Sequence, residues 1–494
     1  MAWMSAWHAK AMSTNSERIV WADRVCTQCA WPLRSVAHTR ELEALHAPRA
    51  GTSLMHEAGL ALARLTLALA PHAKVIWIAC GPGNNGGDGV RAAIHLRQWG
   101  KQPIVTLVHD PLKSPPDARQ AWADAQLAGV TAQPHPPESF DVCLDALFGI
   151  GMQRPITGAY AEWVERMNTA AAPTIAVDIP SGLDADHGTT LEPHVRADAT
   201  LSLLTLKPGL FTAHGRDACG EVWFNTLGVE DHSPASLLLA DPPTSTARPH
   251  ASHKGSYGDV AIVGGAPGMA GAALLAARSA SHGGAGRVFV CMLDQTTAPL
   301  DPSFPELMFR ATASMDWSAL AVVAGCGGAS TIADHLPRLL AGSRRLVLDA
   351  DALNQIAQHP DLQTLTAQRP ADTTVLTPHP LEAARLLGVD TSQVQSDRMG
   401  AALQLAAKFR SVVVLKGSGT VVCTPQGDAH INPTGNAKLA TAGTGDVLAG
   451  LIGSYLAQGM QPFAAASAAV YRHGLAAERW QSPVLVASEL CQCI

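Results

Sequence analysis

Short, nearly continuous runs of β-branched and aliphatic residues recur along this chain, and they constrain its fold more than any other feature. Lys74–Cys80 (KVIWIAC) is the clearest run, and it is followed by a glycine-rich segment and by a helical pattern over Val90–Trp99. Strands that are apolar throughout are typical of parallel sheets covered by helices on both faces. Their alternation with helices predicts an α/β fold built from βαβ units. The other strands that we expect in the first half are Pro103–Val108, Phe140–Phe148, Thr174–Ile179 and Ala199–Leu206, with helices at Ala118–Leu127 and Ala159–Met167.

The alternation stops after Glu230 and starts again near His253. Residues 231–252 lack periodicity and contain the stretch Asp241–Thr246 (DPPTST), which is typical of a linker. A chain of 494 residues is long enough for more than one domain. We therefore predict an N-terminal Rossmann-like, doubly wound domain over residues 33–230 and a C-terminal α/β domain over residues 253–494. The linker is long enough for the two to be independent, and residues 1–32 form an extension of uncertain structure. The expected strands of the second half are Asp259–Val263, Arg287–Met292, Leu320–Ala324, Arg345–Leu348, Thr374–Leu376 and Ser411–Leu415, with a hairpin of Val421–Thr424 and Ala429–Ile431 and helices at Asp446–Ala457 and Pro462–Arg479.

The composition excludes several classes of protein. Hydrophobic residues make up 47% of the chain and charged residues 15%, which suffices for complete cores and excludes disorder. The formal charge of −6 gives no electrostatic reason to expect nucleic acid or an anionic membrane as a partner. No run reaches the ~18 apolar residues of a membrane span and no secretory signal is recognisable, so we expect a cytoplasmic protein. The cysteines fit reduced thiols, because most lie singly in apolar runs and Cys26-x-x-Cys29 has no second pair at zinc-module spacing.

The first glycine-rich segment, Gly81–Gly89 (GPGNNGGDG), directly follows the strand Lys74–Cys80. Its glycines allow close approach of a ligand, and N–H groups at the start of the following helix can hold a phosphate. Two further polar segments, Asp145–Gly151 (DALFGIG) and Asp178–Gly182 (DIPSG), also follow strands. Because the carboxyl ends of strands in an open parallel sheet face the ligand crevice, the three segments predict one nucleotide site. Asp145 taken alone would also fit a helix N-cap or a turn.

With these motifs, the region from about Leu33 to Val229 resembles the nicotinamide nucleotide hydrate epimerase family, and Leu206–Gly209 (LKPG) extends the resemblance. The resemblance implies that Asp178 contacts the hydrated nicotinamide and acts as general acid and base at the hydroxyl-bearing ring carbon. It also implies a potassium ion with oxygen ligands from Asn85, Asp145 and Ser181. The nucleotide-binding residues that it implies are Asn84, Asn85, Gly86, Gly87, Asp88, Gly149, Ile150, Gly151, Met152, Gln153, Arg154, Pro155 and Asp178.

A second glycine–aspartate segment, Thr441–Asp446 (TAGTGD), lies at the start of the next-to-last predicted helix. Glycine N–H groups at a helix N-terminus can hold a phosphate in transfer, and Asp446 is placed to take a proton from a hydroxyl that attacks phosphorus. Seen alone, Asp446 would also fit an N-cap, and Lys416–Thr420 (KGSGT) would also fit a hairpin turn. The other polar segments that end strands in this half are Asn432–Asn436 (NPTGN), Asp349–Asn354 and Thr377–Glu382, the last of which includes His379.

Together with His253–Gly258 and Val263–Gly265, these segments make the region from His253 to the end similar to the ADP- or ATP-dependent nicotinamide nucleotide hydrate dehydratases, members of the ribokinase-like superfamily. The resemblance implies a ribokinase-like domain that uses magnesium and ADP. Gly325–Ala329 (GCGGA) departs from the family's GPGLG run, so we expect a different loop shape there. By resemblance, Lys416, Gly417, Ser418, Gly419, Thr420 and Gly445 bind ADP, and Ala272, Gly327, His379 and Asp446 contact the hydrate.

The two resemblances together predict a bifunctional enzyme that repairs hydrated NADH and NADPH, and we expect a homo-oligomer. The N-terminal half would interconvert the R and S hydrates, and the C-terminal half would dehydrate the S hydrate with ADP, giving AMP and phosphate. The alternative is a ribokinase-like kinase of a vitamin precursor, such as a hydroxymethylpyrimidine, a thiazole or pyridoxal, joined to a non-catalytic binding module. The presence of Asn85 and Asp178 favours the repair enzyme.

Overall fold

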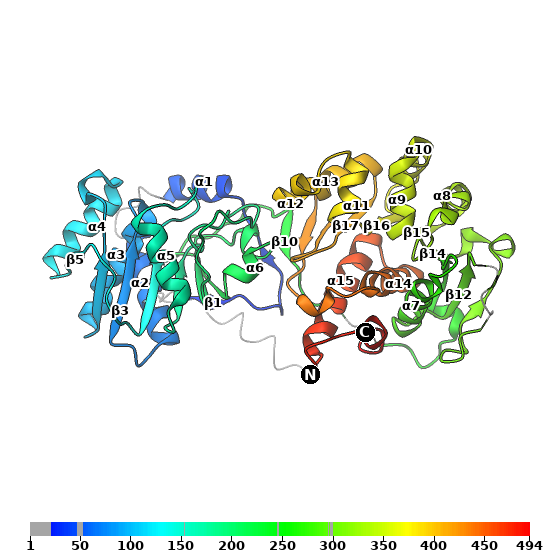
Figure 1. Cartoon of the computed structure of the whole chain (residues 1–494), viewed down its shortest axis with the longest axis horizontal. Helices are drawn as coiled ribbons and strands as arrows, with labels where there is room; N and C mark the ends of the chain where they lie inside the picture. Colours follow the sequence, from blue (N-terminus) through cyan, green and yellow to red (C-terminus); the bar gives the residue numbers. More distant parts are fainter. Residues whose placement is uncertain (1–20, 47–52, 153, 245–246, 295, 297–299) are drawn as a thin grey trace.

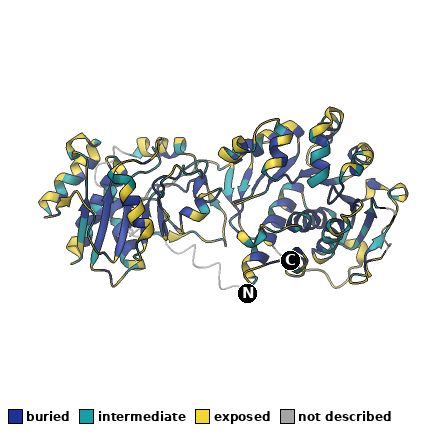
Figure 2. Cartoon of the chain, in the orientation of Figure 1, coloured by how far each residue is buried: buried dark blue, intermediate teal, exposed yellow. Residues whose placement is uncertain are grey.

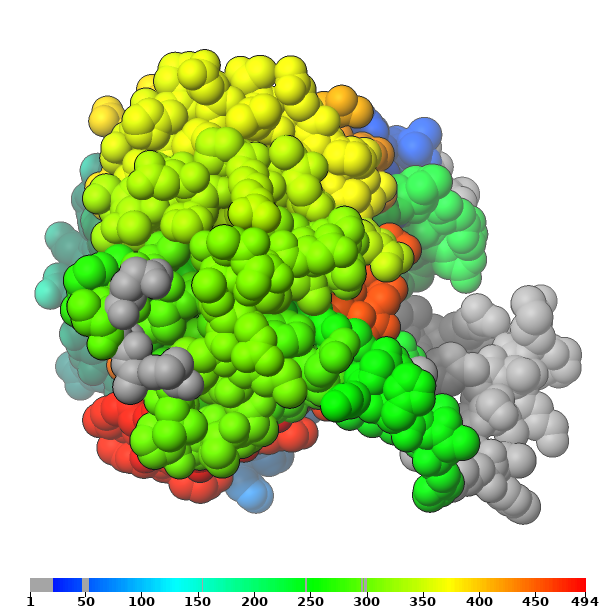
Figure 3. All heavy atoms as spheres, turned by 90° about the vertical axis from the view of Figure 1, so that its right-hand side faces the viewer, coloured from blue at the N-terminus to red at the C-terminus, as the bar shows by residue number. Residues whose placement is uncertain are grey.

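The computed structural model describes residues 21–46, 53–152, 154–244, 247–294, 296 and 300–494. The chain forms two lobes side by side along its longest axis, each built on one sheet with helices on both faces (Figure 1). Viewed along that axis from the C-terminal side, the second lobe conceals most of the first (Figure 3). Buried residues concentrate along the two sheets (Figure 2). Most neighbouring strands in both sheets are parallel, so the prediction of an α/β fold is confirmed.

The N-terminal sheet has eight strands in the order β1-β9-β8-β7-β6-β3-β4-β5, parallel except for the β1–β9 pair. From β3 the chain adds β4 and β5 on one side, and then returns to add β6 to β9 on the other side. This is the strand order of a Rossmann-type sheet, with its switch point between β3 and β6. The strands are β1 (Asp23–Arg24), β3 (Val75–Cys80), β4 (Gln102–Thr106), β5 (Ala132–Gln133), β6 (Val142–Ala146), β7 (Thr174–Val177), β8 (Ala199–Leu203) and β9 (Glu221–Asn225).

Helices cover both faces of this sheet. On one face α2, α3 and α4 enclose a core around Leu62 and Ile76, and on the other face α5 packs against Trp77. The first helical residue of α3 is Asn84 rather than the predicted Val90, so most of the glycine segment is helical. The helices are α1 (Val36–His46), α2 (Leu54–Leu69), α3 (Asn84–Gln98), α4 (Pro116–Leu127), α5 (Ala159–Thr169) and α6 (Gly215–Ala218).

Close packing explains why α3 begins so early. The low helix propensity of glycine argued for a loop. In the folded chain, however, a Cβ on Gly86 would lie 2.0 Å from the carbonyl oxygen of Gly81, and a Cβ on Gly87 would lie 2.6 Å from the side chain of Met55. These two glycines therefore serve the approach of the helix to its neighbours, a requirement that local sequence patterns do not reveal.

The C-terminal sheet has eleven strands in the order β13-β12-β11-β14-β15-β16-β17-β18-β19-β10-β2. The strands from β13 to β17 are parallel, and their order reverses between β11 and β14. The strands β17, β18 and β19 then form an antiparallel meander that includes the predicted hairpin. The strands of this half are β11 (Asp259–Gly264), β12 (Arg287–Met292), β13 (Met308–Phe309), β14 (Ala321–Ala324), β15 (Arg345–Leu348), β16 (Thr374–Leu376), β17 (Val412–Leu415), β18 (Val421–Cys423) and β19 (Ala429–Ile431).

A hydrophobic layer lies on each face of this sheet, between the sheet and the helices that cover it. One layer joins α7, α14 and α15 to the sheet around Ile262 and Val323, and the other joins α8 to α13 to the opposite face around Val322 and Leu348. None of the described helices combines the length and the apolar character that crossing a bilayer requires. The helices are α7 (Ala270–His282), α8 (Leu336–Gly342), α9 (Ala350–Gln358), α10 (Pro360–Ala367), α11 (Pro380–Leu387), α12 (Thr391–Ser396), α13 (Arg398–Phe409), α14 (Thr444–Ala457), α15 (Pro462–Arg479) and α16 (Ala487–Gln492).

Two strands from outside the second half complete the C-terminal sheet, which corrects the prediction of a plain linker. β10 (Leu237–Leu239) lies within residues 231–252 and pairs in parallel with β19. β2 (Trp31–Pro32), from the predicted extension 1–32, pairs with β10, whereas residues 1–20 lie outside the described chain. A run of three leucines is too short to show a period, so this pairing follows from tertiary contact alone.

The two lobes are packed against each other rather than independent. A single hydrophobic cluster contains Leu206 and Phe211 from the first lobe and Val421 and Ile431 from the second. Apolar burial across this junction stabilises the contact between the lobes.

Candidate active sites

The switch point of the N-terminal sheet opens into a cavity of about 1100 Å³. The start of α3, the segment after β6 and the end of β7 line it, so the three predicted motifs meet in one place. Gly86 and Gly87 lie outside the lining, and Gln153 lies outside the described residues. The predicted residues that do line the cavity are Asn84, Asn85, Asp88, Gly149, Ile150, Gly151, Met152, Arg154, Pro155 and Asp178.

Asp178 is held by a buried lysine. Its Oδ1 atom accepts hydrogen bonds from Lys207 Nζ and, at 3.1 Å, from the backbone N–H of Leu203. The Lys207 side chain is 0% exposed and also donates to the Leu203 carbonyl at 2.7 Å. Asp178 has a φ of 66°, a conformation that costs a non-glycine residue about 1–3 kcal/mol. The strained backbone and the buried ammonium together fix one orientation of this carboxylate at the cavity wall.

Two further carboxyl groups lie near Asp178. Glu43, on α1, lines the cavity with Arg40, and neither residue stood out in the sequence because a surface helix commonly carries such charges. Burial, followed by the charge of Asp178, raises the pKa of Glu43. The same two causes, in the same order, hold the pKa of Asp88 well above its usual range. Carboxyl groups of raised pKa beside a lysine-paired carboxylate are an arrangement suited to general acid–base chemistry.

The predicted potassium ligands form a buried polar cluster behind this wall. Asp145 accepts hydrogen bonds from the backbone N–H of Ser181 at 2.8 Å and from its hydroxyl at 2.7 Å. Burial raises the pKa of Asp145 to about 6, and no basic side chain in the described chain forms an ion pair with it. Asn85 reaches towards Gly149, and its buried amide nitrogen has no hydrogen-bond partner among the described residues. A buried carboxylate without a counter-ion fits a cation that takes oxygen ligands.

A second cavity, of about 560 Å³, lies between the end of β17 and the start of α14. Lys416, Gly417, Ser418, Thr420 and Gly445, all predicted to bind ADP, line it. Gly419 does not, because it faces the other lobe, where a Cβ at this position would lie 2.0 Å from the carbonyl oxygen of Phe211. The same cavity is lined by Thr434, Gly435 and Asn436 of the NPTGN motif and by two residues that the sequence did not indicate, Arg216 and Asp217 of α6.

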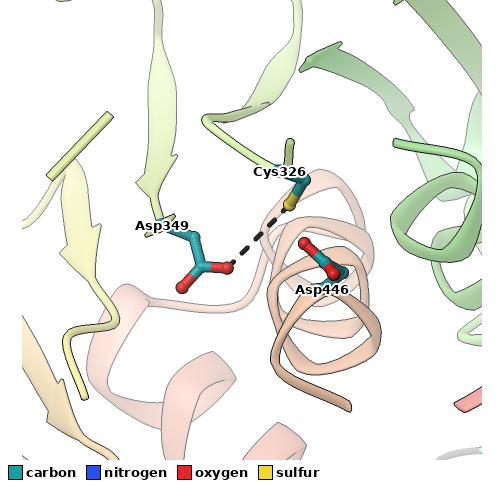
Figure 4. A group of neighbouring side chains, drawn as sticks. All are labelled: Cys326, Asp349 and Asp446. Atoms are coloured by element: carbon teal, nitrogen blue, oxygen red, sulfur yellow. Dashed lines mark hydrogen bonds between the residues drawn. The ribbon is translucent and has the colours of Figure 1, made fainter. Parts of the chain in front are cut away.

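Asp446, in the first turn of α14, points towards Asp349 and Cys326 (Figure 4), and one ligand atom from each of the three lies within 4.8 Å of the others. Burial first, and then the charge of Asp349, raises the pKa of Asp446 to about 7. Lys416 donates to Asp349 Oδ1 at 2.8 Å and lies 3.9 Å from Glu382 Oε2. A carboxyl group with a pKa near neutrality is suited to accept a proton from a hydroxyl.

The residues predicted to contact the hydrate lie beside the second cavity rather than in its lining. A Cβ on Gly327 would lie 2.9 Å from Cβ of Ala272, so these two residues are in contact. His379 caps α11, where its Nδ1 accepts the N–H of Leu381 at 3.1 Å. In the GCGGA loop, Ala329 has a φ of 47°. Alanine therefore occupies a left-handed conformation that favours the glycine of the GPGLG run.

Comparison with known proteins matches both halves. The family model described as NAD(P)H-hydrate dehydratase matches residues 260–493, and the model of the YjeF-related protein N-terminus matches residues 51–209. The bifunctional NAD(P)H-hydrate repair enzyme Nnr of Escherichia coli K12 is 35% identical over 443 residues, which cover 86% of this chain and 84% of that protein. The corresponding enzyme of Vibrio cholerae is 37% identical, with 90% and 91% covered. The solved ADP/ATP-dependent NAD(P)H-hydrate dehydratase of Bacillus subtilis, co-crystallised with ATP and Mg²⁺, is 31% identical, covers 51% of this chain and 92% of its own, and gives a TM-score of 0.43.

The fold and the two sites together define a two-domain α/β enzyme. One cavity lies at a Rossmann-type switch point, and a second cavity lies beside a glycine-rich helix N-terminus. The extent of the similarity shows that the chain belongs to the family of bifunctional NAD(P)H-hydrate repair enzymes. Hydrate epimerisation and ADP- or ATP-dependent hydrate dehydration, the two activities predicted from the sequence, are those of this family. The alternative of a vitamin-precursor kinase is not supported.

The Asp178–Lys207 pair generates a prediction about stability. Lys207→Met leaves a carboxylate without its buried partner, so we expect the free energy of unfolding to fall by about 3–5 kcal/mol. Asp178→Asn leaves the ammonium unpaired and should cost a comparable amount. The double variant Asp178→Asn/Lys207→Met removes both charges and should lose less than the sum of the two.

Urea unfolding followed by circular dichroism measures this double-mutant cycle. Lys113→Met, at an exposed lysine on the same lobe, is the matched control and should change stability by less than about 0.5 kcal/mol. Strictly additive losses in the cycle would show that the two side chains do not stabilise each other.

Proposed function

We propose that residues 33–230 interconvert the R and S hydrates of NADH and NADPH, and that residues 253–494 dehydrate the S hydrate. The observation that carries this division is chemical. The N-terminal cavity combines Asp178 with the carboxyl groups of Glu43 and Asp88, whose raised pKa suits proton transfer, whereas the C-terminal site joins Asp446 to a glycine-rich helix start and Lys416, which suit phosphoryl transfer.

In the N-terminal cavity, Asp178 acts at the ring carbon that bears the hydroxyl. Inversion of that carbon requires a proton to be delivered as the hydroxyl leaves or the ring opens, and a proton to be removed as water or the ring nitrogen adds back. Lys207 keeps the Asp178 carboxylate in one orientation, so the same group serves both steps. The segments after β3 and β6 hold the rest of the nucleotide, with Asn84 and Asp88 from α3 and Gly149 to Pro155 along the opposite wall.

Potassium is proposed as the cation of this half. Asp145, Ser181 and Asn85 would hold it, and its charge would offset the buried carboxylate and stiffen the two segments that form the cavity wall. This assignment is supported by the missing counter-ion of Asp145.

In the C-terminal site, the hydroxyl of the S hydrate attacks the terminal phosphorus of ADP, the proposed donor. Asp446 takes the hydroxyl proton, while Lys416 and the N–H groups at the start of α14 stabilise the transferring phosphoryl group. The carbon–oxygen bond then breaks with release of phosphate, and loss of a proton from the neighbouring carbon restores the ring double bond. AMP, phosphate and NADH or NADPH are the products.

Magnesium is proposed to accompany the nucleotide. The carboxylate of Asp349, next to Lys416 and Asp446, suits a hard cation shared with phosphate oxygens, whereas the Cys326 thiol in the same cluster does not. Bound there, the cation would supply positive charge to the phosphates.

The division of labour is tested with two variants. The purified protein is incubated with mixed epimers of NADH hydrate, ADP, Mg²⁺ and potassium, and NADH absorbance is followed. Asp446→Ala should slow dehydration by about 10²–10⁴-fold and leave epimer exchange intact. Asp178→Ala should leave consumption of the S hydrate unchanged and slow that of the R hydrate.

Each variant is the folding control for the other half. Identical behaviour of the two variants would contradict the division, and no NADH from the wild type with either ADP or ATP would contradict the function as a whole.

The potassium site predicts a cation dependence that Asp145→Asn removes. In wild-type protein dialysed into tetramethylammonium buffer, added KCl should raise both the epimerisation rate and the melting temperature. Asp145→Asn should show neither response, and Asp446→Ala should retain both. A wild type that is indifferent to KCl in both measurements would refute the assignment.

The raised pKa of Asp446 predicts the pH dependence of dehydration. Because a base must be deprotonated, kcat/KM should fall as the pH drops through about 7 and level off above it. Asp349→Asn removes a neighbouring negative charge, so the midpoint of the kcat/KM profile should move to lower pH, even if the maximal kcat/KM also falls. Cys326→Ala removes a hydrogen bond that lowers the pKa of Asp446, so its midpoint should move the other way. Midpoints that coincide in all three proteins would show that another group titrates.

A further inference from the structure

An arginine of the N-terminal domain lies in the nucleotide cavity of the C-terminal domain. Arg216 belongs to α6, a few residues after the LKPG motif, and it lines the 560 Å³ cavity together with Lys416 and Gly445. Its guanidinium donates to the carbonyl oxygens of Gly435 at 2.8 Å, Pro433 at 3.1 Å and Thr434 at 3.5 Å. All three carbonyls belong to the NPTGN motif, which forms one wall of that cavity.

The positive charge of Arg216 is not neutralised by a direct ion pair. Within the described ranges of the chain, no carboxylate lies within ion-pair distance of its guanidinium, whose partners are carbonyl oxygens. Burial lowers the pKa of Arg216, which indicates how far the group is removed from water, although an arginine stays protonated. The negative charges of Glu478 and Asp217 act on Arg216 from beyond ion-pair distance, and a partly buried guanidinium on a cavity wall favours an anionic ligand.

A second contact holds the other glycine-rich wall of the cavity to the same part of the N-terminal domain. The N–H of Ala213 donates to the Ser418 carbonyl at 3.1 Å, and the Ser418 hydroxyl donates to the Ala213 carbonyl at 2.8 Å. The Thr212 hydroxyl lies 3.3 Å from the carbonyl oxygens of Ser418 and Gly419. Residues 212–217, here called the interdomain clamp, thus contact both nucleotide segments, Lys416–Thr420 and the NPTGN motif.

We propose that the interdomain clamp is part of the dehydratase nucleotide site, with Arg216 as a binding residue for the polyphosphate of ADP or ATP. The inference rests on the proposed nucleotide site and deepens it. Arg216 acts in two ways. Its fork-shaped guanidinium fixes the NPTGN wall through three carbonyls, and its charge adds to that of Lys416 in a cavity that must accept a polyanion.

Isothermal titration of ADP into the full-length protein tests the proposal. Arg216→Gln keeps a hydrogen-bonding side chain but removes the charge, and it should weaken ADP binding by about tenfold or more. Arg216→Lys keeps the charge without the fork and should lie between Arg216→Gln and the wild type. Arg24→Gln, which breaks an exposed ion pair with Glu221 on the same domain, is the matched control and should bind ADP as the wild type does.

A readout at the other site separates binding from misfolding. Epimer exchange should stay within about twofold of the wild type in each variant, because Arg216 does not line the N-terminal cavity. Thr212→Val, a milder change in the same clamp, should weaken ADP binding by a few-fold and serves as the second probe if Arg216→Gln does not fold.

Unchanged ADP affinity in Arg216→Gln, or in Thr212→Val if the former does not fold, would overturn the inference while leaving the proposed function intact. Wild-type protein that binds ADP but yields no NADH from the hydrate would overturn the proposed function. The role of the interdomain clamp in ADP binding would then still be decided by titrating ADP into the Arg216 variants. Wild-type protein that binds neither ADP nor ATP would overturn both.

Discussion

Both sites are built at the carboxyl ends of parallel strands. At β3 and β6 successive connections leave the sheet in opposite directions, so their loops part and expose the carboxyl ends of the strands. In the second lobe, the segments after β14, β15 and β17 meet at the start of α14. The motifs that end neighbouring strands then converge, although they are up to a hundred residues apart in the chain. Asn84, Gly149 and Asp178 reach one crevice in this way, and Cys326, Asp349 and Lys416 form one cluster in the second lobe.

Burial of charge sets the chemistry at these points. In the first lobe, Lys207 is withdrawn completely from water and faces Asp178, while Asp88 and Glu43 are driven towards their protonated forms. In the second lobe, Lys416 is shared by Asp349 and Glu382, and Asp446 has a raised pKa beside them. Each site therefore has more acidic groups than cations to pair them, which keeps a proton available for transfer.

The junction ties these two chemistries together. The LKPG motif carries Lys207, which pairs with Asp178, and a few residues later the chain enters the interdomain clamp, which contacts Lys416–Thr420 and the NPTGN motif. β2 and β10 extend the C-terminal sheet with strands from the N-terminal side, and one apolar cluster fills the space between the lobes. Residues of the first lobe therefore form part of the wall of the cavity in the second lobe.

The sequence by itself determined the fold class, most of the central strands and the motifs around Asp178 and Asp446, because continuous apolar runs and glycine–aspartate segments are local signals. It did not reveal that Asn84 starts a helix, that Leu237–Leu239 is a strand, that Lys207 pairs with Asp178, or that Arg216 lines the second cavity. The tertiary structure decided these points for one physical reason. A glycine that must approach a distant backbone, a three-residue edge strand and a buried cation paired with residues far along the chain all owe their conformation to partners outside any sequence window, so no local pattern marks them.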